Sequence, residues 1–412
     1  MSSISLILLV IILIINYFIY KRYKYDKKLY LISLIFIIIN FAFIYLIYRN
    51  NLSLGFENGI VFGDKLGLLA TDEYKYFMES EHLVYNLKNY GGFKAYFNGE
   101  LVTYPFKVDN KPYGIYNYFV FILAVLKCLG IKSLIELLTL KLIFMVFNTY
   151  LVYNISRKFL NEKFALIATI VFNMAPAYIL INATLLRDNI IITAILMLIL
   201  LIIEGKWNFK NIIILGVMAL FLNILRVYTL IALIATFIFT FKKSNKIISK
   251  VDISFIILFI LGLFLFDKIS TNIGEIEYLQ YNYHEYFGTG ITGMIALLFQ
   301  TIKNIFVRGL FLNTLPTKSI YVMLTVLGAV YYMLLVPLFI YKVIIILFID
   351  RDETKVWLCK FTIYFTLLNA LILMLKDIMI PTRLCIMWYL LHIIIILLPV
   401  KKNDFIPKRY RE

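Results

Sequence analysis

The 412-residue chain has few charged residues, few cysteines and few histidines. Charged residues make up 16% of it, whereas a soluble domain has roughly 25%. The three cysteines lie in or beside apolar stretches without metal-type spacing, so the sequence predicts no disulfide framework. Three histidines without an HExxH-like pattern predict no dedicated zinc site. Eight prolines and 18 glycines are too sparse for a soluble linker.

Hydrophobic residues, in contrast, make up 62% of the chain and are arranged in long blocks. These blocks are 4–20, 29–48, 164–180, 190–203, 254–266, 321–348 and 384–400. Several reach the ~20 apolar residues that a helix needs to cross hydrocarbon. An unpaired backbone is costly in lipid, so the blocks must be helices. The sequence predicts an all-α polytopic transmembrane helix bundle of about 10–12 membrane segments, with residues 1–412 as a single integral membrane domain.

The formal net charge of +17 comes mainly from short basic links between the apolar blocks. The main links are 21–24, 157–158, 242–243, 401–402 and 408–409. This is the positive-inside pattern, so the charge reports membrane topology and does not indicate nucleic acid as a partner. We therefore expect an integral plasma-membrane protein with its N-terminus outside and a cytoplasmic tail, 401–412. The first twenty residues lack a basic n-region and a small-residue cleavage site, which predicts an uncleaved anchor.

The longest polar stretch, 49–115, has balanced charge and is predicted to be external loop 1, with short helices folded against the membrane. Residues 268–311 are predicted to form external loop 2. Within it, Gln300, Asn304 and Arg308 recur every four residues, which predicts an amphipathic helix on the outer surface with these side chains facing water.

Two stretches are harder to place. Residues 116–131 and 134–154 are both apolar, yet two full crossings would leave the basic link at 157–158 outside. Either 116–131 is a re-entrant or surface segment, or this link violates the rule. Residues 211–241 are predicted to form a tight pair of arms with Arg226 near the turn.

Asp72 and Glu73 follow Thr71 near the start of the first external loop. One interpretation is a helix start, in which Thr71 caps the helix and both carboxylates complement its dipole. The other makes one carboxylate a catalytic general base beside the headgroup of a lipid-linked substrate. Both can hold at once, because a capped helix is a rigid mount.

Arg187 and Asp188 open an apolar helix on the predicted outer side. They form either an interfacial ion pair or, together with the helix N-terminus, an anion site suited to a phosphate. Arg226 lies deep within thirty apolar residues and needs a partner or a wet cavity. Asp188 and a lipid phosphate are its candidate partners.

The last predicted external turn contains Lys376 and Arg383, which are either boundary anchors or part of a cationic rim for a pyrophosphate. His284 and Glu285 lie among tyrosines in the second loop, where they either pack at the interface or bind a sugar. Tyr76, beside the first-loop carboxylates, is a further candidate sugar-binding residue.

Several short motifs occur in an informative order. The first is an Asp-Glu-x-x-Tyr motif, Asp72 to Tyr76, followed by a Tyr-Pro-rich stretch at Tyr104-Pro105 and Pro112 to Tyr116. A Leu-Gly hairpin at Leu129-Gly130 comes next, and then a helix end that contains Pro176 and is followed by the acidic Asp188. This order resembles the GT-C superfamily of polytopic glycosyltransferases and the capsule and O-antigen polymerase-like membrane proteins. The resemblance covers about residues 60–240.

The resemblance implies a sugar or growing glycan on a polyprenyl phosphate carrier, used in cell-envelope polysaccharide biosynthesis. Asp72 or Glu73 then matches the catalytic carboxylate, and Arg187, Arg226 and Arg383 by position suit the carrier's phosphates. No metal site is assigned, and a divalent metal cofactor stays open because the chain has no unambiguous second Asp-x-Asp motif. Membrane lipids and an envelope synthesis complex are the other partners considered.

Two alternatives differ in class. A transporter or flippase of lipid-linked glycans would more often place its charges deep in several helices around a central cavity. A non-catalytic scaffold of an envelope synthesis complex would need no such site. The long first loop and its carboxylates favour the enzyme.

Overall fold

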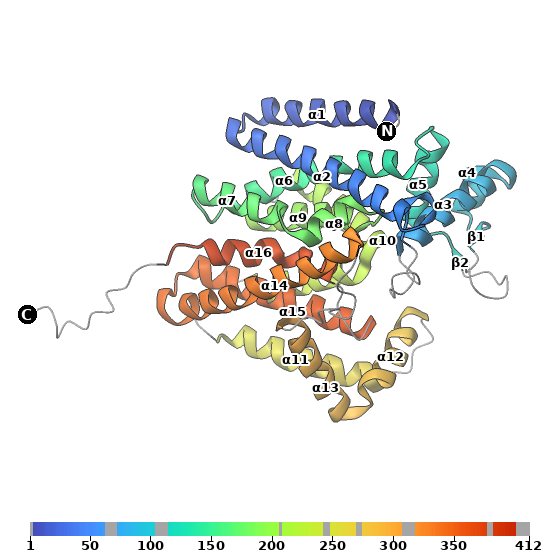
Figure 1. Cartoon of the computed structure of the whole chain (residues 1–412). Helices are drawn as coiled ribbons and strands as arrows, with labels where there is room; N and C mark the ends of the chain where they lie inside the picture. Colours follow the sequence, from blue (N-terminus) through green and yellow to red (C-terminus); the bar gives the residue numbers. More distant parts are fainter. Residues whose placement is uncertain are drawn as a thin grey trace, which may run out of the picture. The chain divides into compact units, whose positions relative to one another are not determined.

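The computed structural model describes residues 3–61, 72–103, 114–205, 208–241, 248–268, 274–306, 318–376 and 382–400. These parts of the chain are almost entirely helical, as the sequence predicts (Figure 1). The one strand pair described is short and antiparallel, with β1 (Val102–Thr103) pairing with β2 (Gly114–Ile115). Thr71 and Arg308 lie outside the described residues.

Among the described residues, six helices are long and apolar enough to cross a membrane. They are α1 (Ser3–Tyr23), α2 (Lys27–Ser53), α6 (Leu134–Arg157), α10 (Phe209–Thr240), α14 with its π-helical end η4 (Ile320–Asp350), and α15 (Glu353–Lys376). A seventh is counted if α7 (Glu162–Asn173) and α8 (Pro176–Ala183), bent by 58°, form one span. This is fewer than the ten to twelve segments expected, because several apolar blocks form helices shorter than the ~20 residues that a crossing needs.

The chain divides into two compact units, of which unit 1 comprises Met1–Leu151, Asn173–Met197 and Phe311–Val326. Its first two helices, α1 and α2, form an antiparallel hairpin (Figure 1). Asp26 caps the start of α2, where its carboxylate accepts the Lys28 N–H at 2.9 Å. Helix α2 also packs against α8, so a membrane-length helix lines the interior of this unit.

The predicted external loop 1 contains the short helices that were expected, α3 (Asp72–Asn89) and α4 (Gly92–Phe97). A tight turn at Gly91, with φ 74°, joins them, and glycine tolerates this left-handed conformation. Helix α3 packs along α5 (Tyr118–Cys128). At 11 residues, α5 is about 16 Å long, which favours the interpretation in which 116–131 does not cross the membrane.

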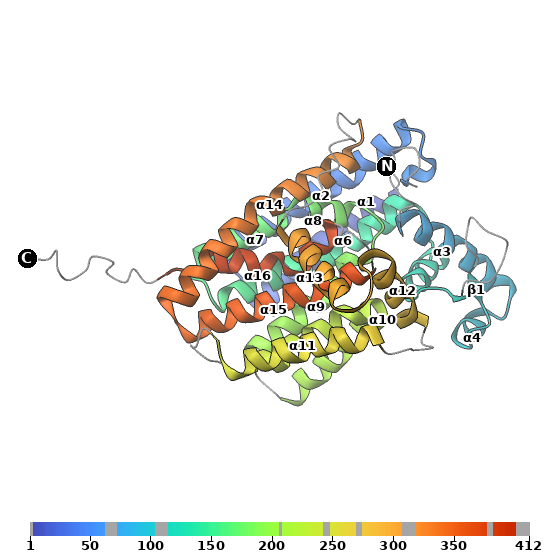
Figure 2. The ribbon, with the colours of Figure 1, turned by 90° about the horizontal axis from the view of Figure 1, so that it is seen from below.

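Unit 2 comprises Val152–Phe172, Leu198–Leu310 and Leu327–Glu412. Helix α15 is its centre and contacts four other helices; α14, α15 and α16 also lie near one another in Figure 2. The helices packed on α15 are α10, α12 (Gly274–Phe287), α13 (Gly290–Phe306) and α16 (Ile386–Leu397). The remaining elements are α11 (Lys250–Lys268), which contacts α10 and α13, and η5 (Thr382–Cys385), which precedes α16.

The prediction of a tight pair of arms at 211–241 is wrong. These residues form one long helix, α10, which kinks at Arg226, where φ is −162° and ψ is 78°. Neither glycine nor proline occurs in residues 217–240, so nothing in the sequence favours a reversal. The backbone leaves helical geometry only at Arg226, so two helical segments meet there at a kink.

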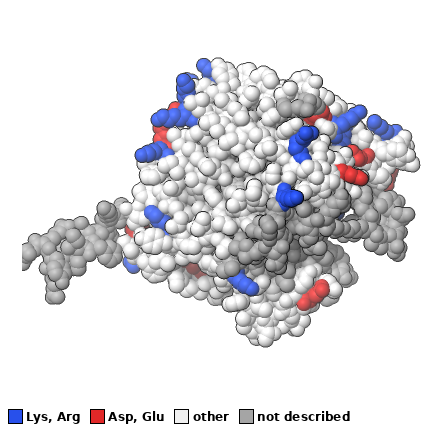
Figure 3. Space-filling model, in the orientation of Figure 1, with Lys and Arg blue, Asp and Glu red and all other residues white. Residues whose placement is uncertain are grey.

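The orientation predicted for the amphipathic helix is also wrong for the residues described. In α13, Asn304 is buried and Gln300 is half-buried, whereas Ile295 and Phe299 are exposed. The buried side of α13 mixes polar and apolar residues, and its exposed side is mostly apolar but includes Lys303. A mostly apolar exposed side suits hydrocarbon better than water. Figure 3 likewise shows a described surface that is mostly free of charged side chains.

Candidate functional site

The polar interior of unit 1 centres on a break between two helices. Helix α8 begins with Pro176 and ends at Ala183, and α9 (Asp188–Glu204) begins after four intervening residues. The first N–H groups and last carbonyls of a helix have no partner within it. In apolar surroundings these groups must be satisfied by other parts of the protein.

The carbonyl groups of the break are satisfied by one buried lysine of α6. The Lys141 ammonium donates to the carbonyl oxygens of Ile181 at 2.7 Å and Leu186 at 3.2 Å, and also to that of Thr184. A lysine has three N–H donors, so this set uses all of them. Lys141 is therefore a cap for the broken backbone, held within the helix bundle.

A carboxylate at the start of α3 satisfies an N–H of the same break. The Glu73 Oε1 atom accepts a hydrogen bond from the Leu185 N–H at 2.7 Å. Glu73 and Asp188 are each only 3% exposed, and both interact electrostatically with the Lys141 ammonium. Buried charges persist only when they are paired and hydrogen-bonded, so the three ionisable groups stabilise one another.

A chain of buried amides extends the polar cluster toward the other helices. Asn182 donates to the Asn40 Oδ1 atom at 3.0 Å, and Asn189 donates to the Asn182 Oδ1 atom at 2.5 Å. Asn148 donates to the Tyr178 hydroxyl at 3.0 Å and to Asn189. These bonds connect α2, α6, α8 and α9. In a low dielectric, such a network rigidifies the helices that contribute to it.

The structure brings together two stretches that the sequence singles out separately. Asp72 is half-buried in the first turn of α3, beside Glu73, and Arg187 is half-buried just before α9. The Glu73–Leu185 hydrogen bond attaches the start of α3 to the break, two residues before Arg187. The partly accessible Asp72 and Arg187 therefore each lie within two residues of the buried Glu73–Leu185 hydrogen bond.

Tyr76 is buried in unit 1. It is 6% exposed, and its ring meets that of Phe119 edge to face with 5.2 Å between the centroids. The ring packs α3 against α5.

Unit 2 holds the other arginines predicted to bind phosphate. Arg226 is 6% exposed at the kink of α10, where its Nη1 atom lies 3.7 Å from the Met387 sulfur and its guanidinium 5.7 Å from the Tyr228 ring centre. Asp188, considered as its partner, belongs to unit 1 and interacts with Lys141. Arg383 is half-buried in η5.

The predicted sugar-binding pair of the second loop also lies in unit 2. His284 and Glu285 are both exposed on α12, and the His284 ring centre lies 5.4 Å from that of Tyr283. The Lys376 side chain lies outside the described residues.

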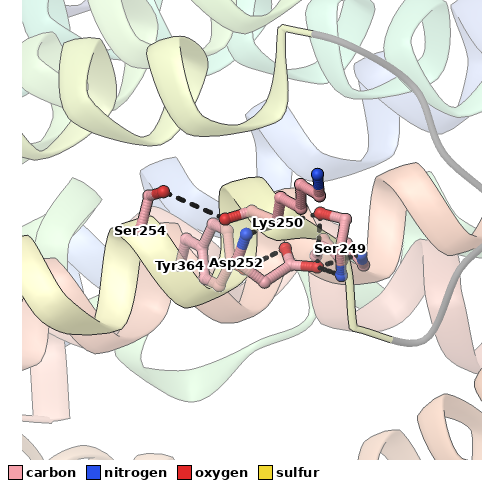
Figure 4. A network of polar contacts seen from close by, with 6 residues as sticks. Ser249, Lys250, Asp252, Ser254 and Tyr364 are labelled. Atoms are coloured by element: carbon pink, nitrogen blue, oxygen red, sulfur yellow. Dashed lines mark hydrogen bonds and ion pairs between the residues drawn. The ribbon is translucent and has the colours of Figure 1, made fainter.

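A separate polar network links α11 to α15 within unit 2 (Figure 4). The Asp252 carboxylate accepts from the Lys360 ammonium at 2.6 Å, the Tyr364 hydroxyl and the Ser249 hydroxyl at 2.7 Å. It also accepts the Ser249 N–H at 2.5 Å, which completes a capping box at the start of α11. With these partners engaged, the cluster is a structural cross-link between two helices.

Lys141 is the residue of this cluster that the sequence analysis misses. A signal was present, because it is a single cation inside the apolar run 134–154, and ionisable residues within membrane helices are usually functional or structural centres. Its partners are backbone carbonyls 40 to 45 residues away, which no side-chain pattern encodes.

In the part of the chain that the structure describes, no three His, Cys, Asp or Glu side chains gather in a way that could hold a metal ion. Comparisons with protein-family models, curated proteins and solved structures find no match.

Proposed function

We propose that the protein is a membrane glycosyltransferase or polysaccharide polymerase that uses a polyprenyl-phosphate-linked sugar in cell-envelope glycan synthesis. The Glu73–Leu185 hydrogen bond is the observation that carries this proposal. It holds the first-loop carboxylates against the segment that bears Arg187. This contact supports a site in which a first-loop carboxylate is the base for an acceptor and Arg187 the cation for a phosphate.

The two neighbouring carboxylates have different surroundings, which supports different roles. Glu73 is buried and its Oε1 atom accepts a backbone N–H, so it positions the site. Asp72 is half-buried in the same helical turn and is the better candidate for contact with a substrate. We therefore assign Asp72 as the catalytic base and Glu73 as a positioning residue.

The proposed reaction is a displacement at the anomeric carbon of the donor. The acceptor hydroxyl oxygen forms the new bond to that carbon while the bond from carbon to phosphate oxygen breaks. Asp72 receives the hydroxyl proton, and the lipid phosphate leaves with the bonding electron pair. The leaving phosphate gains negative charge, which a fixed guanidinium such as that of Arg187 stabilises well in a dry site.

One observation favours a transporter or flippase of lipid-linked glycans as a second candidate. The broken helix pair in unit 1 surrounds buried charges and a chain of buried amides, and transporters place their binding sites at such breaks. However, the Lys141 donors are already used by the backbone, which gives that cluster a structural purpose.

The decisive experiment uses purified full-length protein in lipid nanodiscs with a polyprenyl-phosphate-linked sugar and an acceptor glycan. Asp72→Asn is expected to lower the transfer rate by about 10²–10⁴-fold, the usual effect of removing a general base. Glu81→Gln is the matched control, because Glu81 is an exposed carboxylate on the same helix. Near-wild-type transfer by Asp72→Asn at equal protein level would remove the main support for an enzyme.

A translocation assay distinguishes the second candidate. In proteoliposomes, a flippase moves the lipid-linked glycan between leaflets without consuming it. A transferase releases the lipid phosphate and extends the acceptor. Translocation without any product would favour the transporter, and neither activity would favour the scaffold.

A further inference from the structure

A pocket in unit 2 differs from the polar site because its accessible wall is entirely apolar. It measures about 170 Å³ and lies among α13, α14, α15 and α16. Its lining includes Ile302, Phe306, Val336, Phe339, Leu367 and His392. Protein interiors seldom leave spaces much larger than a water molecule. A space of this size in a packed helix bundle therefore needs an occupant or a purpose.

The pocket has a buried floor and an exposed mouth. Phe339 and His392 are 8% and 1% exposed, and their rings stack with 4.0 Å between centroids. Ile302 and Phe306 of α13 are 47% and 43% exposed. The pocket thus reaches the surface of unit 2 at α13 and ends beneath it at α16.

The surroundings of the mouth indicate which molecules can enter. The outward side of α13 is apolar, with Ile295 and Phe299 more than 60% exposed. On α14, which also lines the pocket, Leu334 and Leu338 are exposed too. In a chain with six helices able to cross a membrane, such faces contact lipid hydrocarbon. The mouth therefore opens where acyl chains are the most abundant molecules.

Size and chemistry restrict the occupant further. A dry cavity of about 150 Å³ lined by Leu, Ile and Phe takes up benzene, a molecule of six carbons. The pocket here is of similar size, and a wall without accessible polar atoms gives neither water nor a headgroup a partner. The Thr366 hydroxyl lies 3.2 Å from the His392 Nε2 atom. The His392 Nδ1 atom is buried and has no hydrogen-bond partner among the described residues, but it is not accessible from the pocket.

We propose that this pocket binds the end of one acyl chain of a bilayer lipid, which enters between Ile302 and Phe306. About six carbons of the chain fill the space, and the rest of the lipid stays in the surrounding bilayer. Such a lipid fills the core between α13, α14, α15 and α16 and makes their packing dependent on the membrane. This proposal does not rest on the glycosyltransferase assignment.

The test uses Trp388, which is fully buried one helical turn from His392. Trp207→Phe and Trp357→Phe leave it as the single tryptophan of the full-length protein in nanodiscs. Phosphatidylcholine brominated near the end of its acyl chains is expected to quench Trp388 saturably, and more than lipid brominated near the glycerol. An unquenched Trp388 would overturn the proposal.

Two filling variants and one matched control identify the route to Trp388. Leu367→Phe and Val336→Phe each add bulk to the pocket wall, whereas Leu338→Phe adds a ring on the exposed side of α14. The saturable part of the quenching should be lost in either filling variant that remains monodisperse and kept in Leu338→Phe. Equal quenching in all three would show that the chain does not use this pocket. Quenching by a brominated alkane but not by the lipid would identify a free apolar ligand and likewise overturn the proposal.

Discussion

Glu73 and Leu185, 112 residues apart in the sequence, are joined by a 2.7 Å hydrogen bond from the Leu185 N–H to the Glu73 carboxylate. This bond connects α3 to the break between the two apolar helices α8 and α9. The break keeps its shape because the Lys141 ammonium of α6 donates hydrogen bonds to its carbonyl oxygens. The stability of unit 1 and the candidate site therefore depend on the same three buried ionisable residues, Lys141, Glu73 and Asp188.

Removing Lys141 should destabilise the protein strongly. Lys141→Met leaves the carbonyls of the break without their donor and two buried carboxylates without their cation, which costs about 3–5 kcal/mol. Lys158→Met is the control, because Lys158 is 39% exposed and pairs with Glu204 at the surface, where an ion pair contributes about 0–1 kcal/mol. The measurement is the thermal unfolding midpoint in detergent micelles. Equal midpoints for the two variants would contradict the structural role of Lys141.

Glu73 and Asp72 should differ in what their substitution changes. Glu73→Ala removes the acceptor for the Leu185 N–H and should lower the unfolding midpoint, while Glu73→Gln keeps an oxygen there and should lower it less. Asp72→Asn should leave the midpoint nearly unchanged and lower transfer. Thermal unfolding and a transfer assay on the same preparations measure whether each substitution changes stability or activity. A midpoint lowered more by Asp72→Asn than by Glu73→Ala would reverse the assignment.

The buried amide chain should contribute to stability through its satisfied groups. Asn189→Ala removes the hydrogen bonds that the Asn189 side chain makes with Asn182 and Asn148, and each such hydrogen bond contributes about 0.5–1.5 kcal/mol. Asn98→Ala is the control because Asn98 is exposed, so a change within about 0.5 kcal/mol is expected. Denaturant unfolding of the two variants measures the difference, and a loss no greater for Asn189→Ala would contradict it.

Lys127 predicts a pH dependence of stability. Burial lowers the pKa of its ammonium from 10.5 to about 8, against the opposing charge of Glu81. Below that pKa the folded and unfolded states both hold the proton. Between about pH 8 and 10.5 the unfolded state binds more protons, so this group makes stability rise with pH. The wild type should therefore gain stability relative to Lys127→Met between pH 7.5 and about 10. A constant difference between the two unfolding midpoints over that range would contradict this.

Topology can be tested by labelling single cysteines in intact cells. The exposed native Cys128 must first be replaced by serine. A cysteine at Lys88, exposed near the end of α3, should react with an impermeant reagent. One at Asn245, in a basic link predicted to be cytoplasmic, should react only after permeabilisation. The opposite pattern would invert the topology.

The sequence by itself determined the class of the chain and the existence of most of its helices. Apolar runs of about 20 residues allow one low-energy conformation in hydrocarbon, so α1, α2 and α6 follow from composition alone. The short helices of 49–115 followed from polar composition together with aromatic residues. The importance of Asp72, Glu73, Arg187 and Asp188 also came from local patterns, because ionisable groups at the edge of apolar blocks are rare and costly.

Only the tertiary structure decided how those residues are used. The kink of α10 at Arg226 and the burial of Asn304 on α13 depend on which neighbours each helix packs against, and a local sequence pattern does not contain those neighbours. Lys141 is a single cation in the sequence, but its partners are carbonyl oxygens of a distant break. Side-chain patterns in the sequence reveal which helix faces are polar. Backbone N–H and C=O groups are chemically the same at nearly every residue, so the sequence does not mark which of them lack a partner. The three-dimensional fold decides which of these groups a polar side chain meets.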